Sequence, residues 1–345
     1  MKKKLAFVLD HKLHHYRAPL FAALGAFYEV TVFHRGPFVE HCEFRQEILG
    51  YKKIGPFEYI ASFPHFLGFD AVVVMQNLRL LNLYMLPLCF RKKPILLWGI
   101  GTSSAKGLDS ESLLSVCFRN AVTSIYNGLA LYSSIPLGKY WKINQRKIQV
   151  VGNSVLNVQA VDTSSATKNY ALFIGTLNKR KGLSELISSF ARALEVCPDL
   201  RLKVIGDGPE KLNLLEQANR LGVANKVGFL GAINDPIEKR KIFKHAFCVV
   251  SPFQAGLSVV ESFSYGVPFV TSANAITGGE SQSIIHEENG VFFRDVSELP
   301  DILCSFVDGR RYSAVLGNNA YQYYQSRLSF ELYVENFKRF LDQYL

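Results

Sequence analysis

The 345-residue sequence has no long uncharged apolar run. A helix that crosses a bilayer needs roughly 20 such residues, and the nearest stretch, VVVMQNLRLLNLYMLPLCF, is interrupted by Arg79. The opening MKKKLAFVLDHKLHHY has a basic start, but its apolar run ends at Asp10 and is too short for a signal peptide. We therefore expect no membrane span, and we expect the first apolar run to form a strand.

Metal and disulfide patterns are also missing. The six cysteines form no C-x-x-C pair and no metal spacing, and there is no Asp-x-Asp triplet. Low-complexity segments and internal repeats are absent as well. These absences predict reduced core cysteines, a cytoplasmic protein and chemistry without a bound metal.

Acidic residues are scarce in the first half of the chain. Residues 1–165 contain 19 Lys and Arg against 10 Asp and Glu, whereas residues 166–345 contain 20 against 19. Most of the formal net charge of +10 therefore belongs to the first half. Nucleic acid, an anionic membrane surface or a phosphorylated substrate is compatible with such a field, and so is an ordinary solvated surface.

Short apolar runs alternate with amphipathic stretches throughout, a pattern typical of parallel β-α-β units. The pattern stops at a polar segment, 162–169, and then starts again. We predict an α/β fold with two doubly wound Rossmann-like domains facing a cleft: an N-terminal domain over 1–165 and a C-terminal domain over 166–325. A last helix over 326–345 is expected to pack back toward the first domain.

The first half is expected to form strands over 4–10, 29–35, 70–76, 94–100 and 128–134, with helices over 16–27, 78–90 and 110–122. Ligands of doubly wound sheets bind beyond the carboxyl ends of the strands. The loops that follow the predicted strands are therefore the places to look for chemistry.

In the second half, GTLNKRKG places Lys179, Arg180 and Lys181 at the predicted start of a helix. Positive side chains there oppose the helix dipole, and a bound anion would remove that conflict. Solvated basic residues on a loop are the other interpretation. The sequence favours a phosphorylated ligand at this loop.

The stretch SPFQAGLSVVESFSYGVPFVTS contains a lone carboxylate, Glu261. Ser258 and Glu261 match the S-x-x-E capping box, which needs no ligand. The same residues also allow a binding function, in which Gly256 permits close approach, helix N–H groups hold a diphosphate and Glu261 accepts hydrogen bonds from a ribose. The two interpretations are compatible.

Two further loops carry a weaker signal. The turn IGDGPE is well formed for structural reasons and is not the G-x-G-x-x-G fingerprint. The loop ITGGESQSIIHEENG is rich in glycine and contains Glu280, which is compatible with a loop that closes on a ligand or with a plain surface turn.

Taken in order, ALFIGTLNKRKGLSELISSFARAL, LRLKVIGDGPEKLNLL, KVGFLGAI and VVSPFQAGLSVVESFSYGVPFVTS resemble the nucleotide-sugar domain of retaining glycosyltransferases of family 4, which have the GT-B fold. The resemblance covers about residues 170–293. In the first half, HHYRAPLFAAL resembles the acceptor-domain opening of some bacterial members.

The resemblance implies that Lys181, helped by Arg180, stabilises the donor diphosphate and that Glu261 binds the ribose. It implies further donor contacts from Gly175, Thr176, Gly206, Gln254, Gly256, Leu257 and Ser258. The implied reaction transfers a hexose with retention of configuration, and it uses no cofactor other than the nucleotide-sugar co-substrate.

Two positions depart from the family pattern. Thr176 stands where the family usually has an Arg, and Phe253 stands where its first paired glutamate is expected. That glutamate normally contacts the hexose hydroxyls, so Phe253 puts the sugar specificity in question. Gln254 is the neighbouring polar residue that could bind the sugar instead.

The first half supplies the expected acceptor side. His14 and His15 follow the first strand and are candidate catalytic residues, while Arg17 and Gly101 are candidate acceptor contacts. The expected acceptor is a saccharide or a lipid-diphosphate-linked sugar of a bacterial surface polysaccharide or lipopolysaccharide. The basic first half would then dock on the inner face of the cell membrane.

Other functions stay open at this point. One alternative keeps the fold as a nucleotide-sugar epimerase or hydrolase, and another is a non-catalytic nucleotide-sugar-binding or assembly partner in which Phe253 and Thr176 mark lost catalysis. No basic-aromatic motif or recognition helix supports a nucleic-acid-binding module. The sequence does not predict the oligomeric state, the sugar or the base.

Overall fold

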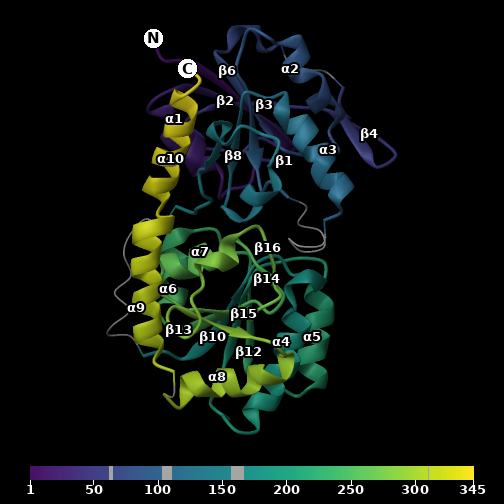
Figure 1. The fold of residues 1–345 in the computed structure, drawn as a ribbon. Coiled ribbons are helices and arrows are strands. Elements are labelled where there is room, and N and C mark those ends of the chain that lie inside the picture. Colours follow the sequence, from purple (N-terminus) through teal and green to yellow (C-terminus); the bar gives the residue numbers. More distant parts are fainter. Residues whose placement is uncertain (62–64, 103–110, 157–166, 310) are drawn as a thin grey trace. The chain divides into compact units, whose positions relative to one another are not determined.

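The structure is a computed structural model that describes residues 1–61, 65–102, 111–156, 167–309 and 311–345. The chain forms two compact units (Figure 1): Met1–Leu156 with Phe330–Leu345, called unit 1, and Asn157–Ser329, called unit 2. The boundary expected after residue 165 thus falls after 156, and the boundary expected after 325 falls after 329. Most of the expected linker, 162–169, lies outside the described residues.

Unit 1 is built on a parallel seven-stranded sheet in the order β3-β2-β1-β6-β7-β8-β9. Its central strands are almost entirely buried, as is usual for a parallel sheet covered on both faces. The strands are β1 (Lys4–Lys12), β2 (Glu29–Arg35), β3 (Arg45–Ile48), β6 (Ala71–Met75), β7 (Ile95–Gly99), β8 (Gly128–Leu131) and β9 (Ile148–Val150). A separate antiparallel hairpin joins β4 (Tyr51–Ile54) to β5 (Phe57–Ile60).

The α-helices of unit 1 are α1 (Ala18–Gly25), α2 (Leu86–Cys89), α3 (Leu113–Ser124) and α10 (Phe330–Asp342). The continuous helix expected over 78–90 is wrong. The segment forms a 3-10 turn, η2 (Leu81–Tyr84), and the one-turn helix α2. Pro87 explains the break, because it has no N–H for the carbonyl of Leu83 and its ring would clash there.

Helix α10, the last helix of the chain, belongs to unit 1. Its Phe337 is fully buried, and its ring lies 5.9 Å from that of Phe7 and 5.1 Å from that of Trp98. Phe7 and Trp98 come from β1 and β7, so α10 covers the middle of the sheet and completes the core of unit 1.

Unit 2 is built on a parallel six-stranded sheet in the order β12-β11-β10-β13-β15-β17. Its strands are β10 (Tyr170–Ile174), β11 (Leu202–Ile205), β12 (Val227–Gly231), β13 (Ala246–Val250), β15 (Phe269–Ser272) and β17 (Gly290–Phe293), and two short strands, β14 (Gln254–Ala255) and β16 (Ile276–Thr277), pair with each other. The α-helices are α4 (Leu183–Leu194), α5 (Lys211–Arg220), α6 (Pro236–Phe243), α7 (Leu257–Ser264), α8 (Leu299–Val307) and α9 (Ser313–Tyr323).

Both sheets have a topological switch point. In unit 1, β1 lies between β2 and β6, and in unit 2, β10 lies between β11 and β13. The chain therefore leaves the first strand of each sheet on one side and later returns on the other, which opens a crevice at the carboxyl ends of these strands. The predicted doubly wound architecture is confirmed, and the loops after β1 and β6, and after β10 and β13, lie where a ligand is expected.

Candidate functional site

The site of unit 2 begins with two loops whose backbones touch. Gly175 follows β10 and Gly206 follows β11, at φ +144° and +142° respectively. A Cβ atom on Gly206 would lie 1.9 Å from the carbonyl oxygen of Gly175, so the backbones could not approach this closely with a side chain there. The Leu177 N–H also donates to the Asp207 carbonyl at 2.9 Å, which ties the loops together.

The basic residues of the first loop lie before the helix and not in its first turn. Lys179–Lys181 form their own 3-10 turn, and α4 begins after Gly182, whose φ of +72° cannot continue a right-handed helix. The three basic residues therefore directly precede the N-cap of α4, the helix that the sequence predicts from Gly182. Glu185 occupies the first turn of α4 and matches the helix dipole.

Lys181 turns back over the loop. Its Nζ atom would lie 3.2 Å from a Cβ atom on Gly175, so the amine covers the glycine backbone directly. Burial lowers the pKa of Lys181 to about 8, Glu280 and Glu261 act to raise it, and Arg180 acts to lower it. A partly desolvated amine near neutral pH gains more from an added anion than an amine in water does.

Helix α7 does not begin with the expected capping box. Its N-cap is Gly256, and no side chain caps it, so Ser258 is already the second helical residue. The Ser258 hydroxyl is buried, with the residue 8% exposed, and it makes no hydrogen bond with the described residues. Nothing lies within 4 Å of the Cβ position of Gly256. The helix start thus offers free N–H groups, a free hydroxyl and open space, the features of an anion site.

Glu261 is held by a residue that sequence reasoning missed. The Lys239 Nζ atom, from α6, lies 2.6 Å from Glu261 Oε1, and both side chains are largely buried. The sequence gives no signal for this pair, because Lys239 belongs to a run of basic residues that looks like a solvated helix face. The contact fixes one carboxylate oxygen of Glu261.

The stretch before α7 is pinned by the glycine-rich loop. Strand β14 pairs with β16, and the Ile276 N–H donates to the Phe253 carbonyl at 2.8 Å. Glu280 follows β16, and its carboxylate accepts the Gly278 N–H at 3.0 Å. The Glu280 carboxylate also acts to raise the pKa of Lys181. The loops after β10, β13 and β15 therefore lie close together.

Phe253 fills space beside the first loop. A Cβ atom on Gly182 would lie 2.7 Å from its Cδ2 atom, so the ring packs against the N-cap of α4. Thr176 is exposed, Gln254 and Leu257 are half-buried, and Arg180 is exposed on the 3-10 turn.

In unit 1, the loop after β1 gathers the predicted histidines. The ring of His14 stacks on that of Tyr16 at 5.4 Å and lies 5.2 Å from that of His11, while His15 is exposed. Burial and the neighbouring cationic groups lower the pKa of His14 to about 4. His14 is therefore neutral at pH 7 and able to accept a proton or a hydrogen bond. Asp10, before it, accepts from Asn77 of the loop after β6 at 2.8 Å.

Arg17 and Gly101 are both buried. The Arg17 guanidinium lies 4.6 Å from the Trp98 ring centroid and donates to the Tyr132 hydroxyl at 2.7 Å, so aromatic groups stabilise its charge. A Cβ atom on Gly101 would lie 2.4 Å from Leu131, and its carbonyl accepts from Tyr140 at 2.8 Å. Packing accounts for Gly101 without a ligand.

Within the described ranges, no group of three or more His, Cys, Asp or Glu side chains is placed to hold a metal ion. No helix in the part of the chain that the structure describes is long and apolar enough to cross a membrane.

Residues 158–323 match the model of the family described as glycosyl transferases group 1. The matched residues lie within unit 2, which spans Asn157–Ser329. An uncharacterized glycosyltransferase of Methanocaldococcus jannaschii is 35% identical to this chain over 124 residues, which cover 35% of this chain and 30% of that protein. The chain spans between 15% and 50% of the length of the first curated relatives that it matches.

Solved structures resemble the whole chain. HepE of Anabaena, crystallised with UDP, matches with a TM-score of 0.74 at 15% identity, over 99% of this chain and 100% of that one. The lipopolysaccharide outer core galactosyltransferase WaaB matches with a TM-score of 0.68 at 16% identity, over 99% and 100%. The chain therefore has the GT-B fold of glycosyltransferases, as predicted.

Proposed function

We propose that this protein is a retaining glycosyltransferase of family 4 that binds a nucleotide-diphospho sugar in unit 2. The observation that carries the proposal is the Lys181 amine, which is desolvated by burial and lies over Gly175 in the loop after β10. The Ser258 hydroxyl, which has no partner among the described residues, follows the neighbouring strand β13. A diphosphate would give the amine a counter-charge and the hydroxyl an acceptor. The family match and the UDP complex of HepE support the same ligand class.

The proposed reaction needs little acid-base chemistry from the protein. The bond between the sugar C1 and the diphosphate oxygen breaks, the acceptor hydroxyl oxygen bonds to C1 from the same face, and its proton passes to the leaving phosphate. Lys181, Arg180 and the N–H groups at the start of α7 would stabilise the charge that develops on the diphosphate. Glu261 would hold the ribose hydroxyls, and no metal ion is needed in this scheme.

The acceptor is proposed to bind to unit 1. His14 is neutral and lies with His15 in the loop after β1, at the switch point of that sheet. The excess of Lys and Arg in this part of the chain supports a diphosphate-linked lipid acceptor presented at the inner face of the cell membrane. Relatives that act in lipopolysaccharide synthesis, such as WaaB, support a role in bacterial surface polysaccharide synthesis.

A panel of UDP, GDP, ADP and dTDP sugars tests the donor assignment. We expect one nucleotide to raise the melting temperature of the purified protein, and its sugar conjugate to be hydrolysed slowly without an acceptor. If no nucleotide diphosphate shifts the melting temperature, the donor site is assigned wrongly.

Phe253 favours a second candidate, a non-catalytic nucleotide-sugar-binding or assembly partner. Its ring packs against Gly182 at the place where the family's first glutamate is expected. Binding of a nucleotide sugar without turnover, with lipid-linked acceptors supplied, would select this candidate. Turnover that drops in Phe253→Ala and persists in Phe253→Leu would instead show that the ring shapes a working sugar site.

A further inference from the structure

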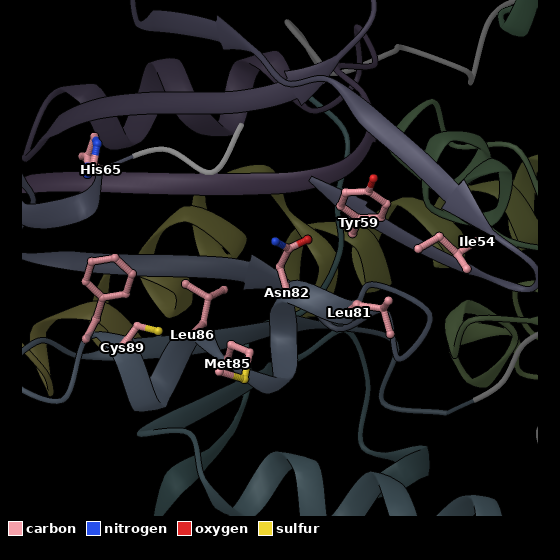
Figure 2. Close-up of a pocket in the computed structure, with 9 residues that line it drawn as sticks. Ile54, Tyr59, His65, Leu81, Asn82, Met85, Leu86 and Cys89 are labelled. Atoms are coloured by element: carbon pink, nitrogen blue, oxygen red, sulfur yellow. The ribbon is translucent and has the colours of Figure 1, made fainter. Parts of the chain in front are cut away.

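Unit 1 has an apolar pocket on the hairpin side of its sheet. The pocket has a volume of about 590 Å³, within the range that holds a small ligand. Figure 2 shows that Ile54 and Tyr59 of the β4–β5 hairpin lie on one side. Leu81 of η2, Leu86 of α2 and Met85 between these two elements lie on the other. The pocket thus lies between the β4–β5 hairpin, which is separate from the seven-stranded sheet, and the segment formed by η2 and α2.

Tyr59, His65 and Asn82 are the polar side chains that line the pocket, and Asn82 is hydrogen-bonded within the protein. Asn82 accepts the Ile60 N–H through Oδ1 at 2.6 Å and donates through Nδ2 to the Ile60 carbonyl at 3.4 Å. Its side chain therefore serves to hold η2 against β5. Apart from His65 and the Tyr59 hydroxyl, the rest of the lining is apolar, so the pocket favours a hydrocarbon over a polar ligand.

The face of the hairpin that lines the pocket combines apolar side chains with a lysine. Ile54 pairs with Phe57 and Lys52 pairs with Tyr59, and because side chains alternate along a strand, these four share the face that lines the pocket. Ile54 is 58% exposed, and Lys52 and Phe57 are exposed as well. A lysine therefore stands at the rim, beside apolar side chains that project into solvent.

Helix α2 repeats this arrangement opposite the hairpin. Met85, which precedes α2, is 57% exposed, and Leu88 is also exposed. Arg91 and Lys92 follow the helix directly and are exposed to solvent. A contiguous exposed apolar patch that is rimmed by polar residues marks an interaction site for a protein or a membrane, or a ligand-binding groove.

The acidic side chains nearby do not cancel this charge. Residues 50–93 contain six Lys and Arg against two acids, Glu58 and Asp70. Glu58 pairs with Arg35 and Lys53, and Asp70 pairs with Lys3. Within the described residues, Lys52, Arg91 and Lys92 have no acidic partner. The rim is positive, so its partner is anionic as well as apolar.

We propose that this surface docks on an anionic lipid bilayer, with a lipid hydrocarbon chain in the pocket. The docking face consists of Lys52, Ile54, Phe57, Met85, Leu88 and Lys92. Apolar side chains that enter the interface, surrounded by Lys and Arg at the headgroups, are the arrangement of peripheral membrane proteins. The proposal rests on the proposed function in one respect: docking would bring the protein to a lipid-linked acceptor at the membrane. The docking face itself is inferred from the residues of unit 1 alone.

Vesicle sedimentation of the purified full chain tests the proposal. We expect binding to vesicles of equal parts phosphatidylcholine and phosphatidylglycerol, and none to vesicles of phosphatidylcholine alone. Raising the salt from about 0.1 M to about 1 M, which shortens the Debye length from ~10 to ~3 Å, should release most of the protein. Lys52→Gln and Lys92→Gln should each weaken binding about fivefold.

The apolar part of the docking face is tested by the double variant Ile54→Glu with Met85→Glu. We expect it to weaken vesicle binding at least about tenfold, because a carboxylate cannot enter the hydrocarbon. The matched control is Leu212→Glu in unit 2, where the native leucine is 72% exposed, and it should bind vesicles as the unaltered protein does. A polarity-sensitive dye on the exposed Cys89, which lines the pocket, should shift to the blue on the anionic vesicles.

The outcomes separate this proposal from the donor assignment. The double variant must keep the melting temperature and the circular dichroism spectrum of the unaltered protein, which shows that unit 1 is folded. Failure of the unaltered protein to bind anionic vesicles, or full binding by the double variant, overturns the docking face while leaving the donor site standing. Vesicle binding without any nucleotide response would overturn the donor site alone.

Discussion

Replacing Lys181 by Met should make the unliganded protein more stable and its nucleotide binding weaker. The lysine is held where burial lowers its pKa from the ordinary 10.5 to about 8. One pKa unit corresponds to about 1.4 kcal/mol, so the buried charge costs up to about 3 kcal/mol of folding free energy at neutral pH. Methionine has a similar length and no charge.

The sign of this effect depends on pH. At pH 7 the amine carries a proton in both the folded and the unfolded chain, and only the folded chain pays the cost of burial. As pH rises above 8, the folded amine loses its proton first, so the cost falls and vanishes near 10.5. Urea unfolding at pH 7 should show the variant more stable by up to about 3 kcal/mol, and the difference should shrink steadily toward pH 10.

Nucleotide binding should change in the opposite direction. With a pKa of about 8, only about a tenth of the amines carry a proton at pH 9, so UDP should bind about tenfold more weakly there than at pH 7. Binding at pH 9 should take up nearly one proton, which calorimetry in buffers of different ionisation enthalpy measures. The phosphate of UDP, with a second pKa of about 6, is already ionised and adds little.

Three results would refute this reasoning. They are a Lys181→Met protein that is less stable at pH 7, an unchanged affinity for UDP in that variant, or UDP binding at pH 9 without proton uptake. Lys179→Met is the matched control, because Lys179 is exposed on the same turn and should change neither stability nor proton uptake appreciably.

Four further predictions concern the same site. Ser258→Ala should leave the melting temperature unchanged or slightly raised, since the hydroxyl has no partner among the described residues, yet weaken UDP binding about tenfold by titration calorimetry. Gly256→Ala should fold normally, because its Cβ would meet nothing within 4 Å, and should weaken UDP binding if phosphate lies against this backbone; unchanged affinity would place the phosphate elsewhere. Lys239→Met should destabilise the protein by about 3 kcal/mol in urea and reduce discrimination between UDP and 2′-deoxy-UDP, whereas Lys239→Arg should restore most of both. Added chelator should leave sugar transfer unchanged, and a loss that Mn²⁺ or Mg²⁺ reverses would contradict the metal-free scheme.

The sequence predicts the central strands well because burial on both faces makes them continuous apolar runs. Strand β6 is AVVVM and β13 is AFCVV, and every residue of both is buried. The edge strand β3 is RQEI, which has no such pattern and forms a strand because it pairs with β2. Such pairing is a property of the neighbour and cannot be read from the segment itself.

In the candidate site, too, some features follow from local sequence patterns and others do not. The loops that carry Lys181 and Glu261 were predicted because each follows a recognisable strand. The capping box expected at Ser258 was wrong, since the helix begins after Gly256 and a shift of two positions turns a capping residue into an unpartnered one. The partner of Glu261 lies 22 residues away on another helix, a distance over which local patterns carry no information.

Helix α10 makes the folding of this chain depend on the order in which it is synthesised. Unit 1 is discontinuous, because its core is completed by residues 330–345, whereas unit 2 is a single uninterrupted segment. During translation, unit 2 can therefore reach its native state while the sheet of unit 1 still exposes the surface that Phe337 later covers. The emerging chain should need a chaperone for its first half and not for its second, and loss of the last sixteen residues should unfold the part of the protein that was made first.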